Sequence, residues 1–189
     1  MFIQTESTPN PNSLKFIADI NIAGSSPREY KNKKQAEKES PLAAELMTID
    51  GVKSVFLGLD FVTVNKSDKC NWEDIKTEIL ATITDFLTCQ KPIINQDTDN
   101  KEKEIEAEDS QIVKQIKELI EIKVRPAVAM DGGDIIYHDF RDGIVFLELK
   151  GSCSGCPSST ITLKNGIENM LKHYIPEVVA VEQIPSEEY

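Results

Sequence analysis

The chain has 189 residues, of which 40% are hydrophobic and 28% charged, and its formal net charge is −11. This composition is typical of a globular protein with a hydrophobic core, and the length allows one large domain or two small ones. No stretch approaches the roughly 18 consecutive apolar residues that a membrane-spanning helix needs. No basic stripe is present to neutralise phosphates, so the sequence predicts neither membrane insertion nor nucleic-acid binding. Four cysteines, only two of them closely spaced, favour a reducing compartment over a secreted disulfide framework.

The N-terminal residues carry no targeting signal of the usual kinds. They lack a basic region followed by an apolar stretch, and they are poor in arginine. We therefore expect either a bacterial cytoplasmic protein or a protein of the mitochondrial matrix whose presequence has been removed.

Residues 1–95 predict a small α+β domain with the element order ββαββα. Residues 2–6 and 13–19 have strand-like composition on either side of the turn TPNPN. Residues 24–40 are polar and rich in lysine, which favours a solvated loop or a loose helix start.

A helix and two further strands are expected in the rest of this domain, before a last helix. Ser40 and Pro41 suit the N-cap and the first position of a helix, and we expect Gly51 to end it. Residues 53–66 predict two strands with a tight turn between them. Apolar side chains over residues 72–87 then recur at helical spacing.

Residues 96–109 predict an acidic linker. This segment, QDTDNKEKEIEAED, holds seven acidic and two basic side chains and very little apolar surface. Such a composition cannot bury enough area to offset the entropy of ordering the chain. The linker divides the chain into the domain 1–95 and a second domain, 110–189, and both are long enough to fold independently.

The second domain predicts the order αββαβ, again a small α+β domain. Its first helix has an apolar side around Ile116 and is expected to stop at Arg125-Pro126. A loop over residues 129–134 leads to a hairpin, whose strands turn at Arg141-Asp142-Gly143. The segment GSCSGC, a second helix and a final strand over residues 178–184 follow.

The two cysteines of this segment, Cys153 and Cys156, form a CxxC pair between a strand and a helix that begins at Pro157. The free amides and the dipole of a helix start favour a thiolate, which is the form that binds metal. A thiol–disulfide pair, half a zinc site and half an iron–sulfur site all fit this spacing, and the context favours a metal centre over a redox pair.

A complete zinc or iron–sulfur site usually needs about four protein donors, and this loop supplies two. Cys70 and Cys89 lie in the other domain and are interpreted as ordinary helix-flanking residues. His138 and His173 are isolated and are not expected to be ligands. Two copies of the chain can therefore complete a site that one copy cannot, which suits a scaffold or carrier.

Other polar residues invite structural interpretations. Asp131-Gly132-Gly133-Asp134 is interpreted as a turn between a helix and a strand rather than a phosphate or metal loop. Arg125 suits either the cysteine loop or the end of a helix dipole. Glu168 and Lys164 have the spacing of a helical surface pair, which contributes little.

The surrounding residues resemble a known family. The run DGGDIIYHDFRDGIVFLELKGSCSGCPSSTITLKNGIENMLKHYIPEV (131–178) is similar to the C-terminal domain of NifU-like proteins. TPNPNSLKF (8–16), residues 40–66 and NWEDIK (71–76) resemble the N-terminal domain of Nfu-type proteins. The resemblance covers most of the chain outside residues 20–39 and the linker.

This resemblance implies an iron–sulfur cluster scaffold or carrier and not an enzyme, so no catalytic residue is expected. Two subunits would share one [4Fe-4S] cluster, with [2Fe-2S] as the other cluster type, and would transfer it to apo iron–sulfur proteins. The implied ligands are Cys153 and Cys156, and no residue of the N-terminal domain. Implied partners are a second copy of the chain, upstream assembly factors and the apo-protein recipients. The alternatives are a zinc-bridged structural dimer and a CxxC thiol–disulfide oxidoreductase.

Overall fold

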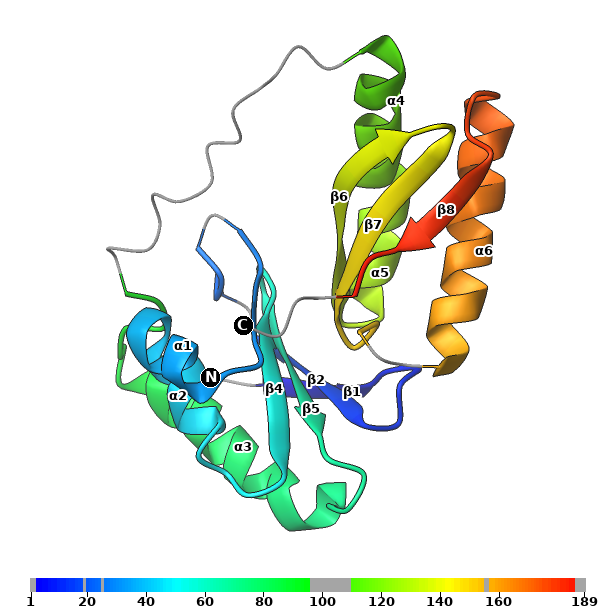
Figure 1. Cartoon of the computed structure of the whole chain (residues 1–189). Coiled ribbons are helices and arrows are strands. Elements are labelled where there is room, and N and C mark those ends of the chain that lie inside the picture. Colours follow the sequence, from blue (N-terminus) through cyan, green and yellow to red (C-terminus); the bar gives the residue numbers. More distant parts are fainter. Residues whose placement is uncertain (1–2, 19, 25, 96–109, 155–156, 186–189) are drawn as a thin grey trace. The chain divides into compact units, whose positions relative to one another are not determined.

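The computed structural model describes residues 3–18, 20–24, 26–95, 110–154 and 157–185. These residues form two compact units, each of which combines one sheet with helices (Figure 1). The predicted α+β class is therefore confirmed. The segment predicted to be an acidic linker, 96–109, lies outside the described residues, and its role stays a prediction.

The described residues of the first unit form a five-stranded antiparallel sheet, β1-β2-β5-β4-β3, with helices on one of its faces (Figure 1). The predicted order ββαββα is confirmed, and one short strand and one short helix are added to it. In chain order the elements are β1 (Ile3–Ser7), β2 (Ser13–Ala18), β3 (Arg28–Tyr30), α1 (Lys33–Glu39), α2 (Pro41–Leu46), β4 (Val52–Leu57), β5 (Phe61–Lys66) and α3 (Trp72–Thr88).

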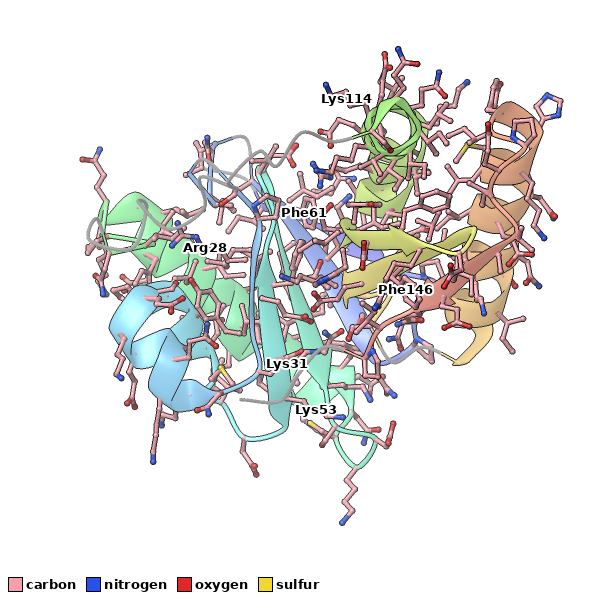
Figure 2. All side chains as sticks on the ribbon, turned by 45° about the horizontal axis from the view of Figure 1, so that its top comes forward. Arg28, Lys31, Lys53, Phe61, Lys114 and Phe146 are labelled. Carbon is pink, nitrogen blue, oxygen red and sulfur yellow. The ribbon has the colours of Figure 1, made fainter. Side chains whose placement is uncertain are left out.

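The core of this unit lies between the sheet and the helices. Alternate strand residues face it, among them Phe16 of β2 and Val64 of β5, which are fully buried. Phe61, labelled in Figure 2, alternates with the core residues of β5 and so lies on the other face of the sheet. The buried face of α3 is the one that its apolar spacing predicts: Ile75, Ile79, Ile83, Phe86 and Leu87.

The prediction of a solvated loop or loose helix start over residues 24–40 is only partly correct, because a short, mostly exposed helix does form but a partly buried strand precedes it. β3 pairs with β4, and Tyr30 of β3 and Ala36 of α1 are fully buried. The side chain of Asn32 caps α1 by accepting a hydrogen bond from the amide of Lys34 at 2.9 Å. A three-residue strand and a seven-residue helix are too short to produce a recognisable apolar period, so the sequence pattern does not reveal them.

The start of α2 is confirmed and its end is not. The hydroxyl of Ser40 accepts a hydrogen bond from the amide of Ala43 at 3.1 Å, as expected of an N-cap. The helix ends at Leu46, and Gly51 lies in the turn before β4 with φ of +95°. A Cβ atom on Gly51 would lie 2.6 Å from the sulfur of Cys70, so this position requires glycine for both reasons.

The described residues of the second unit form a three-stranded sheet, β6-β7-β8, and confirm the order αββαβ. β6 and β7 are antiparallel, and β8 runs parallel to β7, which requires the crossover that α6 supplies. No helix of either unit, within the described residues, is long and apolar enough to span a membrane. The elements are α4 (Gln111–Leu119), the π-helical turn η2 (Ile120–Val124), α5 (Arg125–Met130), β6 (Gly133–Arg141), β7 (Ile144–Gly151), α6 (Pro157–Tyr174) and β8 (Ala180–Gln183).

The prediction that the first helix of this unit stops at Arg125-Pro126 is wrong. The helix widens into η2, where the amide of Arg125 donates to the carbonyl oxygen of Ile120, five residues earlier. Proline lacks an amide hydrogen and would crowd the carbonyl of the preceding turn in a regular α-helix. The π-helical turn accommodates it, so the helix continues to Met130.

The hairpin turn fixes the pairing of β6 with β7 next to the turn, and a register shift between Tyr137 and Asp139 then sets the pairing at the far end. Asp142 and Gly143 have φ of +52° and +78°, the type I′ signature of a two-residue turn, in agreement with the prediction. Phe146 of β7 lies on the face opposite the core, with the guanidinium of Arg141 4.9 Å from its ring centre (Figure 2). At the far end of the pair, Gly133 faces Gly151.

Candidate metal centre

Cys153, the first predicted ligand, lies in the loop that joins β7 to α6. β7 ends at Gly151 with φ of +67°, and the amide of Ser154 donates to the Gly151 carbonyl at 3.2 Å, so the chain turns directly after the strand. Cys156, the second predicted ligand, lies outside the described residues. α6 begins at Pro157, as predicted, so the loop precedes the N-terminus of an 18-residue helix.

The sulfur of Cys153 lies against the backbone of Gly133. A Cβ atom at Gly133 would be 2.9 Å from this sulfur and 2.6 Å from the carbonyl oxygen of Lys150, and real Cβ atoms do not approach other atoms so closely. The sequence predicts Gly133 to be a turn residue, but it is the first residue of β6. The side chain of Cys153 occupies the space that a side chain at Gly133 would need.

An ion pair between Arg125 and Asp134 stabilises the turn beside Gly133. Asp134 is 5% exposed, and its Oδ1 lies 3.0 Å from Nε of Arg125. Arg125 also donates to Oε2 of Glu121 at 2.5 Å and to the carbonyl oxygen of Ile135 at 3.1 Å. Burial raises the pKa of Asp134, and the Arg125 charge opposes that rise. Arg125 therefore joins the helix to β6, a role that neither sequence interpretation anticipated.

The other cysteines lie in the first unit, at the two ends of α3. Cys70 precedes the helix and packs partly buried against the core. Cys89 is the C-cap, is exposed, and its thiol donates to Oδ1 of Asp85 at 3.4 Å. Their interpretation as helix-flanking residues is confirmed.

The two histidines have structural neighbours. Nε2 of His138 lies 2.9 Å from Oε2 of Glu148 across β6 and β7. His173 packs edge-on against Tyr174 at the end of α6, with ring centres 5.0 Å apart. Within the part of the chain that the structure describes, no three His, Cys, Asp or Glu side chains gather as a metal site would require.

Glu168 lies within electrostatic range of Lys164, as its spacing predicts, but two other groups donate hydrogen bonds to its carboxylate. Its Oε2 accepts the backbone amide of Val181 at 3.1 Å, and its Oε1 accepts the ammonium of Lys172 at 2.6 Å. These two hydrogen bonds lower the pKa of the Glu168 carboxyl. Glu168 thus ties β8 to α6, which no local sequence signal indicates because β8 lies beyond the end of the helix.

Two family profiles match the chain in the order of its two units. The family described as "Scaffold protein Nfu/NifU N terminal" matches residues 3–90, and the one described as "NifU-like domain" matches residues 116–182. The first match includes residues 20–39, which the resemblance drawn from the sequence had left uncovered.

Individual relatives match along nearly the whole of this chain. The chain is 50% identical over 189 residues to the human protein named "NFU1 iron-sulfur cluster scaffold homolog, mitochondrial", and it covers 74% of that protein. A protein of the same name from Drosophila ananassae is 46% identical over 184 residues, which is 97% of this chain. The chain spans 64% of the length of that Drosophila relative.

Solved structures match parts of the chain. The solution structure of a NifU-like protein from Saccharomyces cerevisiae is 32% identical, with a TM-score of 0.46, and the match covers 51% of this chain and 86% of that one. The crystal structure of a Staphylococcus aureus protein is 27% identical with a TM-score of 0.37, over 44% of this chain and 99% of that one.

Proposed function

The chain belongs to the Nfu/NifU family of scaffold proteins, and from this premise we propose that it is a non-enzymatic scaffold or carrier of iron–sulfur clusters. In this proposal the chain assembles or accepts a [4Fe-4S] cluster, shares it with a second copy and transfers it to apo-proteins. The observation that carries the proposal is the presence of both family domains, in order, with the Cys153–Cys156 pair in the second.

The ligand chemistry supports this assignment. Each chain offers two thiols in one loop, and an iron–sulfur cluster takes about four protein ligands, so two loops supply the set. The N-terminus of α6 directly follows the loop, and its free amides favour the thiolate form that binds iron. These features fit a sulfur-ligated cluster.

Shared ligation also explains why the protein would transfer the cluster to other proteins rather than keep it. Each chain would hold it through only two sulfur atoms, so separation of the two chains removes half of the ligands at once. A cluster held in this way is easily passed to a recipient protein that offers a full set of thiolates.

The partners and the location follow from the same premise. We expect a homodimer when the cluster is bound, upstream factors that deliver iron and sulfide, and apo iron–sulfur proteins as recipients. The relatives carry "mitochondrial" in their names, which favours the mitochondrial matrix over a bacterial cytoplasm.

Anaerobic reconstitution with iron and sulfide tests the proposal. Native mass spectrometry and Mössbauer spectroscopy should show one [4Fe-4S] cluster per two chains. The loaded protein should then restore a [4Fe-4S] enzyme from its apo-form. A protein that stays colourless and monomeric would refute the proposal, and a [2Fe-2S] spectrum would change the cluster type.

Four single substitutions identify the ligands. Cys153→Ser and Cys156→Ser should each abolish cluster binding, whereas Cys70→Ser and Cys89→Ser, the matched controls, should leave it intact. Zinc at one per dimer without acid-labile sulfide in freshly purified protein would instead support a zinc-bridged dimer. Insulin reduction above the rate of free thiols would support the oxidoreductase.

A further inference from the structure

Ser152, the residue before Cys153, is joined twice to the turn between α5 and β6. It is 1% exposed, although it is a small polar residue in a loop. Its amide donates to the carbonyl oxygen of Gly132 at 3.2 Å, and its hydroxyl donates to the carbonyl oxygen of Asp131. One residue thereby connects the cysteine loop to two successive carbonyl groups that lie about twenty positions earlier in the sequence.

The turn that receives these hydrogen bonds is itself held on both sides. The amides of Asp131 and Gly132 close the C-terminus of α5 through the carbonyl oxygens of Ala127 and Ala129, at 3.3 and 3.0 Å. Gly132 has φ of +81°, as a glycine that ends a helix often does. On the other side Gly133 begins β6. The two carbonyl groups are therefore a fixed anchor, and Ser152 attaches the loop to it.

Cys153 faces inward from this anchored loop. Its side chain belongs to the hydrophobic core of the second unit and is 2% exposed. Its sulfur lies beside Gly133 and 3.7 Å from the hydroxyl oxygen of Ser152. A cluster shared with a second chain must be reached by sulfur atoms from both, and a sulfur in this position is not accessible to a second chain.

We propose that Ser152 is a positioning residue that holds Cys153 inward in the apo-protein, and that its hydroxyl contact with Asp131 opens when Cys153 turns outward to bind the cluster. This inference rests on the proposed function only in taking Cys153 as a ligand. Cluster binding must then supply the free energy that opens the loop. The net affinity of the protein for the cluster is lower by that amount. Closing of the loop after transfer returns the thiol to the core and shields it from oxidants.

Thiol alkylation of the reduced, metal-free full chain tests the inward position. Iodoacetamide rates at each cysteine are measured by peptide mass spectrometry in buffer and in urea, and their ratio is the protection of that thiol. Cys153 should be protected about tenfold or more, as a group that reacts only after local opening. The exposed Cys89 serves as the internal reference and should show a ratio near unity. Equal ratios at the two cysteines would overturn the proposal.

Ser152→Ala tests the role of the hydroxyl. Loss of one ordinary hydrogen bond should lower the protection of Cys153 about fivefold and leave Cys89 unchanged. Thr162→Ala, on the exposed surface of α6, is the control and should change neither. A residue with a purely structural role would lower the unfolding temperature without selectively exposing Cys153. Unchanged protection of Cys153 in a folded Ser152→Ala protein would therefore refute the proposal.

Hydrogen exchange over α4 and β7 shows whether Ser152→Ala has unfolded the second unit. If the second unit has unfolded, the Ser152→Thr variant, which keeps the hydroxyl, is measured in place of Ser152→Ala. A folded Ser152→Thr protein in which Cys153 is unprotected would overturn the proposal. None of these measurements uses iron. A failed cluster reconstitution with the expected alkylation result would therefore count against the proposed function and not against the role of Ser152.

Discussion

Glu168 is expected to hold the last strand of the second unit in place, and Glu168→Ala tests this role. β8 has only four residues and lies at the edge of a three-stranded sheet. The carboxylate of Glu168 accepts the amide of Val181 within that strand at 3.1 Å, and it also accepts the ammonium of Lys172 at 2.6 Å. The alanine variant loses both hydrogen bonds and leaves the Val181 amide without this acceptor.

The expected loss of stability follows from these two contacts. A hydrogen bond to a charged acceptor contributes about 1.5–3 kcal/mol, and an exposed ion pair one helical turn apart contributes about 0.3–0.5 kcal/mol. Glu168→Ala should therefore lower the free energy of opening of β8 by about 2–3 kcal/mol. Lys172→Ala removes only the ion pair and should cost about 0.5 kcal/mol. Glu168→Gln keeps a neutral acceptor and should fall between the two.

The effect should depend on pH in a defined direction. Lys172 and the amide of Val181 lower the pKa of Glu168 in the folded state below that of the unfolded chain. Such a carboxylate stabilises the fold fully above its unfolded pKa, and the stabilisation is lost as the pH falls through its folded pKa. The difference between the wild-type protein and Glu168→Ala should be complete at pH 7 and should shrink below about pH 4.

Native-state hydrogen exchange with mass spectrometry measures this difference. Peptides that cover residues 176–185 report on β8, and peptides that cover α3 in the other unit provide the internal reference. Faster exchange confined to the second unit is the expected result. If Glu168→Ala exchanges no faster than Lys172→Ala, the hydrogen bond to Val181 contributes nothing, and the assigned role of Glu168 is wrong.

Three further predictions follow from close contacts elsewhere. Gly133→Ala places a Cβ against a carbonyl oxygen and the cysteine sulfur and should destabilise the second unit by about 1–3 kcal/mol, measured by urea unfolding with circular dichroism. Gly166→Ala, where nothing lies within 4 Å of the added atom, is its control and should stabilise α6 by up to about 1 kcal/mol. Ser40→Ala removes an N-cap and should cost the first unit about 1 kcal/mol, seen as a lower midpoint of the tryptophan fluorescence transition; an unchanged midpoint would contradict the capping role. Arg125→Ala leaves the buried Asp134 without its cation and should cost about 3 kcal/mol, whereas the double variant with Asp134→Ala should recover part of that loss.

Much of the fold could be predicted because its signals are local. Ser40 is a cap whose partner lies three residues away, and Asp142-Gly143 is a turn that needs only its own backbone angles. The apolar face of α3 and the alternation along β7 are likewise periodic within one element. Such patterns do not depend on the rest of the chain, so the sequence reveals them.

The wrong predictions concern elements that depend on their surroundings. Pro126 normally ends a helix, and here a π-helical turn that packs Ile120 and Val124 into the core lets the helix continue. The strand that contains Tyr30 is only three residues long, and its pairing with β4 makes it a strand. Neither outcome follows from intrinsic propensity, because packing on the sheet decides both.

The sequence by itself determined the two α+β domains, the spacing of Cys153 and Cys156, and the family that the residue runs of both domains resemble. Only the tertiary structure decided that Cys153 faces the core beside Gly133 and that Ser152 is attached to the carbonyl of Asp131. These groups lie about twenty residues apart along the chain. They meet because the pairing of β6 with β7, including its register shift between Tyr137 and Asp139, brings the start of one strand beside the end of the other, and no local pattern encodes that contact.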